Sequence, residues 1–337
     1  ITRRTWLLQA LTGKLELQPF TLRIPAMHEL ILHNYDASPF AEKVRLIMGF
    51  KQLSWRWVNI PRIMPKPDLT ALTGGYRKTP VLQVGADIYC DTALIARRLE
   101  AEKATPALFP EGLEFVCSSF AQWIDSVVFQ HAVALAFQPE AMALRMAKLP
   151  AAAQQAFMAD RAGLFSGGAS SRLPLAQAQL QWPVLMSRLQ LQLSREEGEF
   201  LFGQPSIADF ALAHCLWFVK STPITAPLVD DYPAVAVWPN RVLGFGHGAH
   251  SPLSADEALQ IALAATPAAL PATAPVPVQG IEWGQQVSIA ATDYGVDPVS
   301  GQLLHADNES LILRREDPRA GILHVHFPRV GFRVEAK

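Results

Sequence analysis

The sequence predicts an α/β domain, then an all-α domain, and a small β-barrel or meander after them. Residues 30–58 have the pattern of strand, helix and strand, and residues 81–99 that of two strands and a helix. Residues 113–264 carry apolar side chains mostly at helical spacing. Residues 283–334 form short apolar runs separated by Asp, Gly and Pro turns, which is typical of small all-β modules.

These patterns give the boundaries of the predicted parts. We assign 27–103 to the α/β domain, 104–265 to the helical domain, 266–280 to an Ala- and Pro-rich linker and 281–337 to the β-rich module. Residues 1–26 begin without Met, and charged residues interrupt their apolar stretches, which is unlike a signal peptide. We expect them to be a leader or a cloning remnant that the fold does not need.

The first predicted helix begins directly behind a buried strand. Leu30 to Leu32 form the apolar run, Ser38 offers an N-cap side chain, and Pro39 suits the first helical position. The helix then continues with Phe40, Val44, Ile47 and Met48 at helical spacing.

A second pair of polar segments follows about forty residues later. Thr79-Pro80 precedes the strand Val81 to Val84, and the turn at 85–87 is short enough for a hairpin. Asp91-Thr92 stands where the last helix of this domain begins, so Asp91 can cap that helix.

These motifs resemble the thioredoxin-like N-terminal domain of soluble glutathione transferases, especially the serine-type classes that carry a Ser-Pro-Phe start. The resemblance covers about residues 27–100. It implies a cis Thr79-Pro80 bond, with the backbone of Thr79 pairing with the cysteinyl part of glutathione. It also implies that Phe40 lies at the glutathione site, and that a second, helical domain binds the electrophile.

A bound thiol must lose its proton before it attacks an electrophile. A thiol with a pKa of about 8.5 is only a few per cent ionised at neutral pH, and lowering that pKa by about two pH units needs roughly 3 kcal/mol. A helix N-terminus supplies about 0.3–1 kcal/mol, and one hydroxyl donor to a charged acceptor adds roughly 1.5–3 kcal/mol. Ser38 offers both, so we expect it to be catalytic. The alternative, an ordinary helix cap, is compatible with the same position.

The resemblance also implies subsites for the two carboxylates of glutathione. The hydroxyl and backbone N–H of Thr92, next to Asp91, would receive the γ-glutamyl carboxylate at a helix N-terminus, where unpaired N–H groups bind anions. Lys78 would meet the glycyl carboxylate. A simple cap at Asp91 and a solvated charge at Lys78 are the alternatives.

In the helical domain, the resemblance places the co-substrate pocket against the first helix. Phe120, Trp123 and Ile124 are the expected lining residues, and packing in the core is the alternative. His214 lies on the apolar face of a later helix, which favours a hydrogen-bonded core histidine over a base.

Composition and cysteine content narrow the class of protein further. The chain is 50% hydrophobic and 18% charged, with a formal net charge of -1, so no electrostatic footprint indicates nucleic acid or an anionic membrane. Cys90, Cys117 and Cys215 form no Cys-x-x-Cys pair and suggest a reducing, cytoplasmic location. His324 and His326 share one face of a strand, but two ligands are too few for a metal site, so we expect no metal.

The leading functional hypothesis is a glutathione transferase that uses glutathione as co-substrate against a small hydrophobic electrophile, as a homodimer. The first alternative is a non-catalytic binding or regulatory protein with the transferase fold, which would use residues 281–337 to bind a partner. The second is a glutathione-dependent isomerase or dehalogenase with the same thiol site. Ordinary members of this family end after the helical domain, so the β-rich module departs from their pattern.

Overall fold

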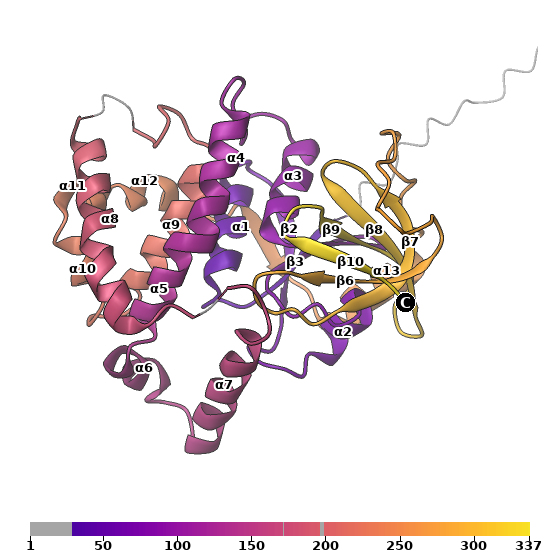
Figure 1. The fold of residues 1–337 in the computed structure, drawn as a ribbon, viewed down its shortest axis with the longest axis horizontal. Coiled ribbons are helices and arrows are strands. Elements are labelled where there is room, and N and C mark those ends of the chain that lie inside the picture. The colour runs from indigo at the N-terminus through magenta and orange to yellow at the C-terminus, as the bar shows by residue number, and fades with distance from the viewer. Residues whose placement is uncertain (1–28, 171, 196–198) are drawn as a thin grey trace, which may run out of the picture.

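The computed structural model describes residues 29–170, 172–195 and 199–337, and it places one ten-stranded sheet beside a group of helices (Figure 1). The predicted leader of residues 1–26 lies outside the described residues. The first domain consists of β1 (Leu30–Asn34), α1 (Pro39–Phe50), β2 (Ser54–Asn59), α2 (Pro67–Thr73), β3 (Val81–Val84), β4 (Asp87–Cys90) and α3 (Thr92–Glu102). Strand β1 pairs parallel with β2 and antiparallel with β3, and β3 forms a hairpin with β4. This arrangement confirms the predicted α/β domain.

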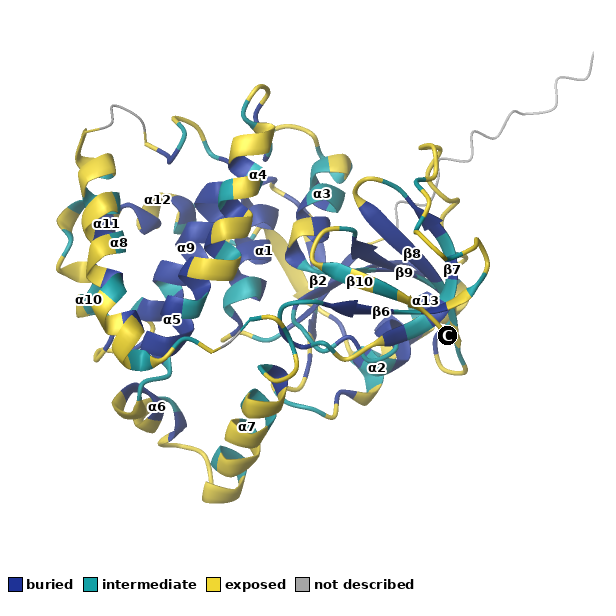
Figure 2. Ribbon diagram, viewed as in Figure 1, coloured by how far each residue is buried: buried dark blue, intermediate teal, exposed yellow. Residues whose placement is uncertain are grey.

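The helical part follows, and most of its helices surround one central helix, whereas the last of them packs against α2. It contains α4 (Glu114–Trp123), the π-helical turn η1 (Ile124–Val128), α5 (Phe129–Ala136), α6 (Pro139–Met146), α7 (Ala151–Leu164), α8 (Leu175–Arg195), α9 (Ile207–Lys220), α10 (Pro227–Asp230), α11 (Pro233–Val237), α12 (Pro239–Leu243) and α13 (Ala255–Ala264). Helix α9 is buried along nearly its whole length (Figure 2) and packs against α1, α4 and α5. Because α1 lies between α9 and the sheet, it joins the two domains.

The C-terminal strands form an extension of the first domain's sheet. Strands β6 (Gln286–Ala291), β7 (Val299–Ala306), β8 (Ser310–Asp317) and β9 (Gly321–Pro328) pair in sequence order as an antiparallel meander, and β10 (Phe332–Ala336) pairs with β6. Strand β9 then pairs parallel with β4. We call residues 281–337 the tail module. The meander agrees with one of the two predicted forms, and its junction with β4 was not predicted.

The opposite edge of the sheet is also extended. Strand β5 (Ala249–Pro252) pairs parallel with β2, although it lies within the region predicted as helical. The chain reaches this edge through a glycine turn that approaches α1 closely. A Cβ atom at Gly49 would lie 2.0 Å from the carbonyl oxygen of Gly246, so only glycine fits at position 49.

The sheet separates two hydrophobic cores. One core lies on the side of α1, α9 and the other helices of the bundle. The other combines Ile31 and Val58 of the first domain with Val325 and Phe327 of the tail module, and α2 and α13 cover it. The tail module therefore shares its core with the first domain.

Candidate functional site

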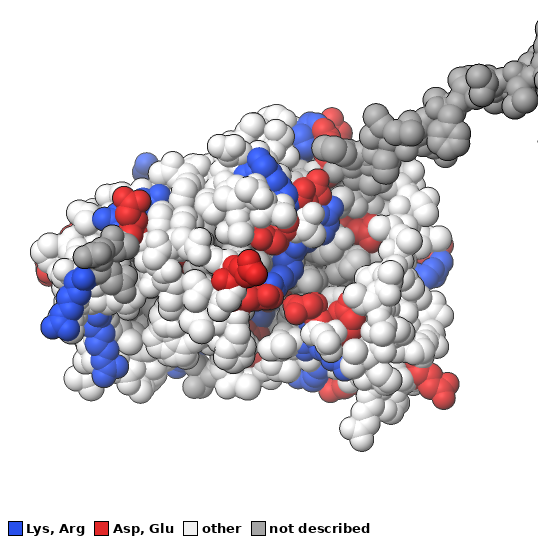
Figure 3. Space-filling view, turned by 90° about the horizontal axis from the view of Figure 1, so that it is seen from above, with Lys and Arg blue, Asp and Glu red and all other residues white. Residues whose placement is uncertain are grey.

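A cavity of about 570 Å³ lies where α1, α3, α4 and the tail module meet. Charged side chains of both signs gather about the middle of the face shown in Figure 3. The cavity is lined by Phe40, Lys43, Tyr76, Lys78, Thr79, Pro80, Asp91, Thr92, Arg97, Phe109, Phe115, Ser118, Gln122, Asp125, Asp293, Tyr294, Glu309 and Phe332, among others. A second hollow, of about 710 Å³, lies at the other end of α1 beside Gly246, and no predicted site residue lines it.

Ser38 caps the N-terminus of α1, whose first turn reaches the cavity at Phe40. Its hydroxyl oxygen accepts a hydrogen bond from the backbone N–H of Ala41 at 3.3 Å, and Pro39 occupies the first helical position. The side chain is only 2% exposed and does not line the cavity, whereas Phe40 does. In the hydrogen bonds of the described residues Ser38 Oγ only accepts, so its proton remains available for an acceptor.

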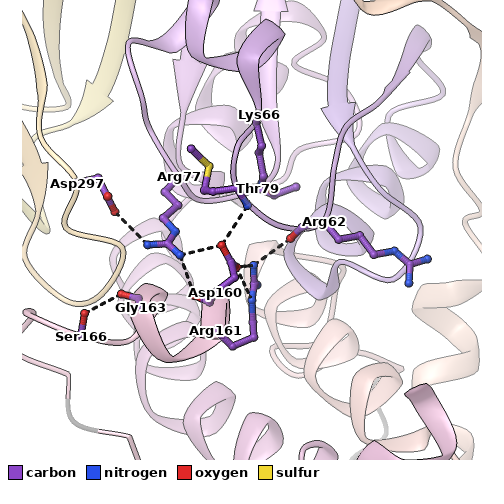
Figure 4. Close-up of polar contacts among 10 residues, drawn as sticks. Arg62, Lys66, Arg77, Thr79, Asp160, Arg161, Gly163, Ser166 and Asp297 are labelled. Atoms are coloured by element: carbon purple, nitrogen blue, oxygen red, sulfur yellow. Dashed lines mark hydrogen bonds and ion pairs between the residues drawn. The ribbon is translucent and has the colours of Figure 1, made fainter. Parts of the chain in front are cut away.

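The Thr79-Pro80 turn forms part of the cavity wall, and its peptide bond is cis, as the resemblance implied. The Lys66 ammonium group donates a hydrogen bond to Thr79 Oγ1 at 3.0 Å (Figure 4). Burial and, to a smaller extent, the nearby Arg161 guanidinium lower the pKa of Lys66 to about 8. Lys66 thus places a buried cation behind the turn, and sequence reasoning missed it.

Asp91 and Thr92 lie at the N-terminus of α3 and also line the cavity. The Asp91 carboxylate accepts a hydrogen bond from the backbone N–H of Ala93 at 2.9 Å, and its backbone has a φ of 75°, which is unusual for a residue other than glycine. Burial raises the pKa of Asp91 although Lys78 opposes this effect. Asp91 thus caps α3, and the neighbouring Thr92, which is 6% exposed, lines the cavity.

Lys78 also lines the cavity, but a carboxylate of the tail module is already bound to it. Lys78 Nζ lies 2.6 Å from Asp293 Oδ1 and 4.3 Å from the centre of the Tyr294 ring. The loop that carries these residues is fixed from its other side, because the N–H of Ala169 donates to the carbonyl of Thr292 at 2.8 Å. A Cβ atom at Gly168 would lie 1.7 Å from the carbonyl oxygen of Asp293, so only glycine permits this approach.

The α4 side of the cavity uses a different helical face from the predicted one. Phe115, Ser118, Gln122 and Asp125 line the cavity and recur every three or four residues, so they share one face. The three predicted lining residues do not line it: Ile124 is 0% exposed in the core, Trp123 is partly exposed, and Phe120 stacks on Trp123 with ring centres 5.4 Å apart.

Asp125 and Lys43 were missed at the sequence level although a signal exists for Asp125. Asp125 is the only Asp, Glu, Lys or Arg between Glu114 and Glu140, which indicates a buried charge with a partner, whereas Lys43 stands beside Glu42 and Arg45 and gives no such signal. In the structure Lys43 Nζ lies 2.5 Å from Asp125 Oδ2, and His214 Nε2 lies 3.0 Å from Asp125 Oδ1. The bond confirms that His214 is a hydrogen-bonded core histidine. Burial lowers the pKa of His214, so its imidazole is neutral at neutral pH.

Helix α7 is held beside the Thr79 turn by a polar network rather than by apolar packing. Only Leu164 of α7 is buried. Asp160 accepts hydrogen bonds from the backbone N–H of Met64 at 3.0 Å and from Arg77 at 2.9 Å, and Arg161 also contacts it (Figure 4). Arg77 is thus occupied by Asp160, which leaves Lys78 and Lys66 as the cations beside the turn.

The two histidines of β9 take a structural role. His326 Nε2 lies 2.8 Å from Asp87 Oδ1, and His324 Nδ1 lies 3.8 Å from the same oxygen, so both contribute to the junction of β9 with β4. No group of three or more His, Cys, Asp or Glu among residues 29–170, 172–195 and 199–337 is arranged to hold a metal ion. Within the same ranges, no helix has the length and apolar character needed to span a bilayer.

Comparison with known proteins connects this geometry to one family. Residues 32–107 match the family model described as "Glutathione S-transferase, N-terminal domain". A solved GST-like protein from Pseudomonas syringae is 56% identical, with a TM-score of 0.78, over 92% of this chain and 100% of that chain. The uncovered 8% is shorter than residues 281–337, so the match includes part of the tail module.

More distant solved structures match a smaller share of the chain. Glutathione S-transferase III in apo form is 20% identical over 64% of this chain and 91% of that one, with a TM-score of 0.47. A theta class glutathione S-transferase from Xanthomonas axonopodis pv. citri, with glutathione bound, is 19% identical over 64% and 93%, with a TM-score of 0.45. No curated protein matches the chain.

Proposed function

We propose that this chain, which belongs to the glutathione S-transferase family, binds glutathione in the 570 Å³ cavity and transfers its thiolate to an electrophile. The observation that carries the proposal is the convergence of three segments far apart in sequence. The start of α1 at Phe40, the cis Thr79-Pro80 turn and the α3 N-terminus at Thr92 all line one cavity.

Each part of glutathione has a matching group in this cavity. The backbone of Thr79 would pair with the cysteinyl part, and the N-terminus of α3 at Thr92 would receive the γ-glutamyl carboxylate. Lys78, with Lys66 behind the turn, would attract the glycyl carboxylate. The electrophile would lie against Phe115 and Gln122 of α4.

Ser38 supplies the chemistry in this proposal. The hydroxyl accepts from Ala41 and has a free proton, so it can donate to a thiolate placed at the N-terminus of α1. The dipole of α1 adds to that stabilisation, because N–H groups at a helix start favour negative charge. The anion then attacks the electrophile, and the leaving group departs with the bonding electron pair.

The test compares two serine variants in the purified protein. Glutathione binding is measured by calorimetry, the pKa of the bound thiol by its ultraviolet absorbance, and conjugation with 1-chloro-2,4-dinitrobenzene by product absorbance. Ser38→Ala should lower kcat/KM at least about tenfold, equivalent to about 1.4 kcal/mol of lost thiolate stabilisation, whereas Ser126→Ala, which removes a hydroxyl from the cavity wall itself, should not. Full activity in Ser38→Ala would remove this serine from the mechanism. Absence of glutathione binding would overturn the whole proposal.

The Ser38 variant needs a stability control, because the same side chain caps α1. Loss of an N-cap costs about 1 kcal/mol of folding free energy, so the folded fraction at the assay temperature is checked by circular dichroism.

The proposal also includes a homodimer and a cytoplasmic location. Light scattering measures the mass in solution and so tests the homodimer. The three free, buried cysteines support a cytoplasmic location.

A further inference from the structure

Asp293 presents a carboxylate to the cavity at the side that the proposed function assigns to the C-terminal end of the thiol ligand. It belongs to the tail-module loop between β6 and β7, lines the cavity and is 41% exposed. Its Oδ1 atom lies 2.6 Å from Lys78 Nζ, whereas no hydrogen bond or ion pair among the described residues involves its Oδ2 atom. One acceptor oxygen of Asp293 is therefore available to a ligand.

The cations of residues 66–78 offer no free charge to the cavity in the part of the chain that the structure describes. Lys78 lines the cavity but is paired with Asp293. Lys66 and Arg77 do not line it. A carboxylate at this end of a ligand would therefore meet the carboxylate of Asp293, whereas a neutral N–H group would find a charged acceptor, which forms a stronger hydrogen bond than a neutral one.

The loop that carries Asp293 is held on both sides of this residue. The backbone N–H of Ser170 donates to the carbonyl of Asp293 at 3.1 Å, and the N–H of Gly295 donates to the carbonyl of Leu164 at 2.7 Å. Gly295 has a φ of 59°, a conformation that favours glycine. The carboxylate is thus presented from a fixed backbone, which reduces the entropy that is lost when a ligand binds to it.

The pair between Asp293 and Lys78 is a minor part of what holds the tail module in place. The tail module shares a hydrophobic core with the first domain, and its strand β9 pairs with β4. Partly exposed ion pairs add little to stability, because water screens their attraction. An anion placed on the cation of the cavity wall is therefore explained better by its effect on ligands than by its effect on folding.

We propose that Asp293 is a specificity-determining residue, and that the preferred thiol ligand of this site carries an amide instead of a free carboxylate at its C-terminal end. The amide N–H would donate to Asp293 Oδ2, and Lys78 would orient the carboxylate through Oδ1. The ligand class is thiol peptides of the glutathione type whose glycyl carboxyl group is joined to ammonia or to an amine. This inference rests on the proposed function for the position of the peptide, and it changes the group that is recognised at one end.

The experiment measures, by calorimetry, the dissociation constants of glutathione, its C-terminal primary amide and its glycyl methyl ester. The wild-type protein should bind the amide about threefold more tightly than the free acid, and more tightly than the ester, which has no N–H donor at this position. Asp293→Asn should weaken binding of the amide at least about threefold and strengthen binding of the free acid, because a charged acceptor is replaced by a neutral one. Binding of the ester should change by less than about twofold.

Asp297→Asn is the matched control. It removes a carboxylate from the same loop, but Asp297 does not line the cavity, so all three affinities should equal those of the wild-type protein. Lys78→Gln removes the cation and leaves the anion, so it should increase the preference for the amide over the free acid, in the opposite direction to Asp293→Asn. A purely structural role of Asp293 would change the three affinities by the same factor.

Two results overturn this inference and leave the proposed function intact. The first is a wild-type protein that binds the free acid as tightly as the amide or more tightly. The second is an amide affinity that does not fall in Asp293→Asn. A wild-type protein that binds none of the three peptides overturns the proposed function, and this inference with it.

Discussion

The ion pair between Lys78 and Asp293 predicts that the tail module competes with glutathione for a cation of the site. The two groups lie 2.6 Å apart, and their side chains are 12% and 41% exposed. Partly exposed pairs of this kind contribute about 0.2–1 kcal/mol, because water screens the attraction and the side chains lose freedom. A ligand carboxylate must displace Asp293 to gain the full attraction of Lys78.

Asp293→Asn removes the competing charge and keeps the size of the side chain. The affinity for glutathione should rise by about 1.4- to 5-fold, the equivalent of the pair's free energy, and the gain should shrink at high salt. Calorimetric titration at low and high ionic strength measures both effects. Asp297→Asn is the matched control, because Asp297 lies on the same loop, 3.8 Å from Arg77, and among the described residues it forms no ion pair with Lys78. Weaker binding in Asp293→Asn would refute the reasoning and show that Asp293 positions the loop for the ligand.

Three further predictions concern stability. Asp160→Asn should loosen α7 by about 3 kcal/mol, since Arg77 and its neighbours lose a buried anion, and faster hydrogen exchange confined to residues 151–164 would show this. Burial lowers the pKa of His33 from 6.5 to about 4, so as the pH falls the unfolded chain binds a proton before the folded protein does. The free energy of unfolding of the wild-type protein therefore falls as the pH drops from about 6.5 to about 4. In urea unfolding, the loss of unfolding free energy caused by His33→Gln should shrink by about 2 kcal/mol between about pH 7.5 and pH 5. A constant cost would contradict this. Phe327→Ala should lower the free energy of unfolding by about 3–5 kcal/mol. The first domain and the tail module should still melt in one calorimetric transition, because they share a core. Two transitions would contradict the shared core.

Features encoded by neighbouring residues were predictable from the sequence. The cap and first turn of α1 follow from Ser38 and Pro39, and the β3–β4 hairpin follows from the turn at 85–87. The family resemblance, which rests on the same short motifs, led to Thr79 and Thr92 as site residues, and both line the cavity. The roles assigned to them remain predictions.

Features that depend on distant pairings were not predictable. No local pattern indicates that β9 pairs with β4, because a strand's apolar alternation fixes its faces and not its neighbour. The face of α4 that lines the cavity differs from the face with the predicted residues, because the helix has apolar residues on more than one side and Ile124 is buried in the core. Asp293 lies 215 residues from Lys78 in sequence, and only the folded tail module brings them together.

The position of Phe332 in the cavity wall affects the order of events during synthesis of the chain. A ribosome releases the domain with Ser38 and Thr79 long before it has translated β9 and β10. Until then the outer edge of β4 has no strand beside it, and the wall formed by Tyr294 and Phe332 does not exist. A nascent chain can therefore fold its early elements before the cavity is complete, and during that interval the edge of β4 is open to pairing with other strands.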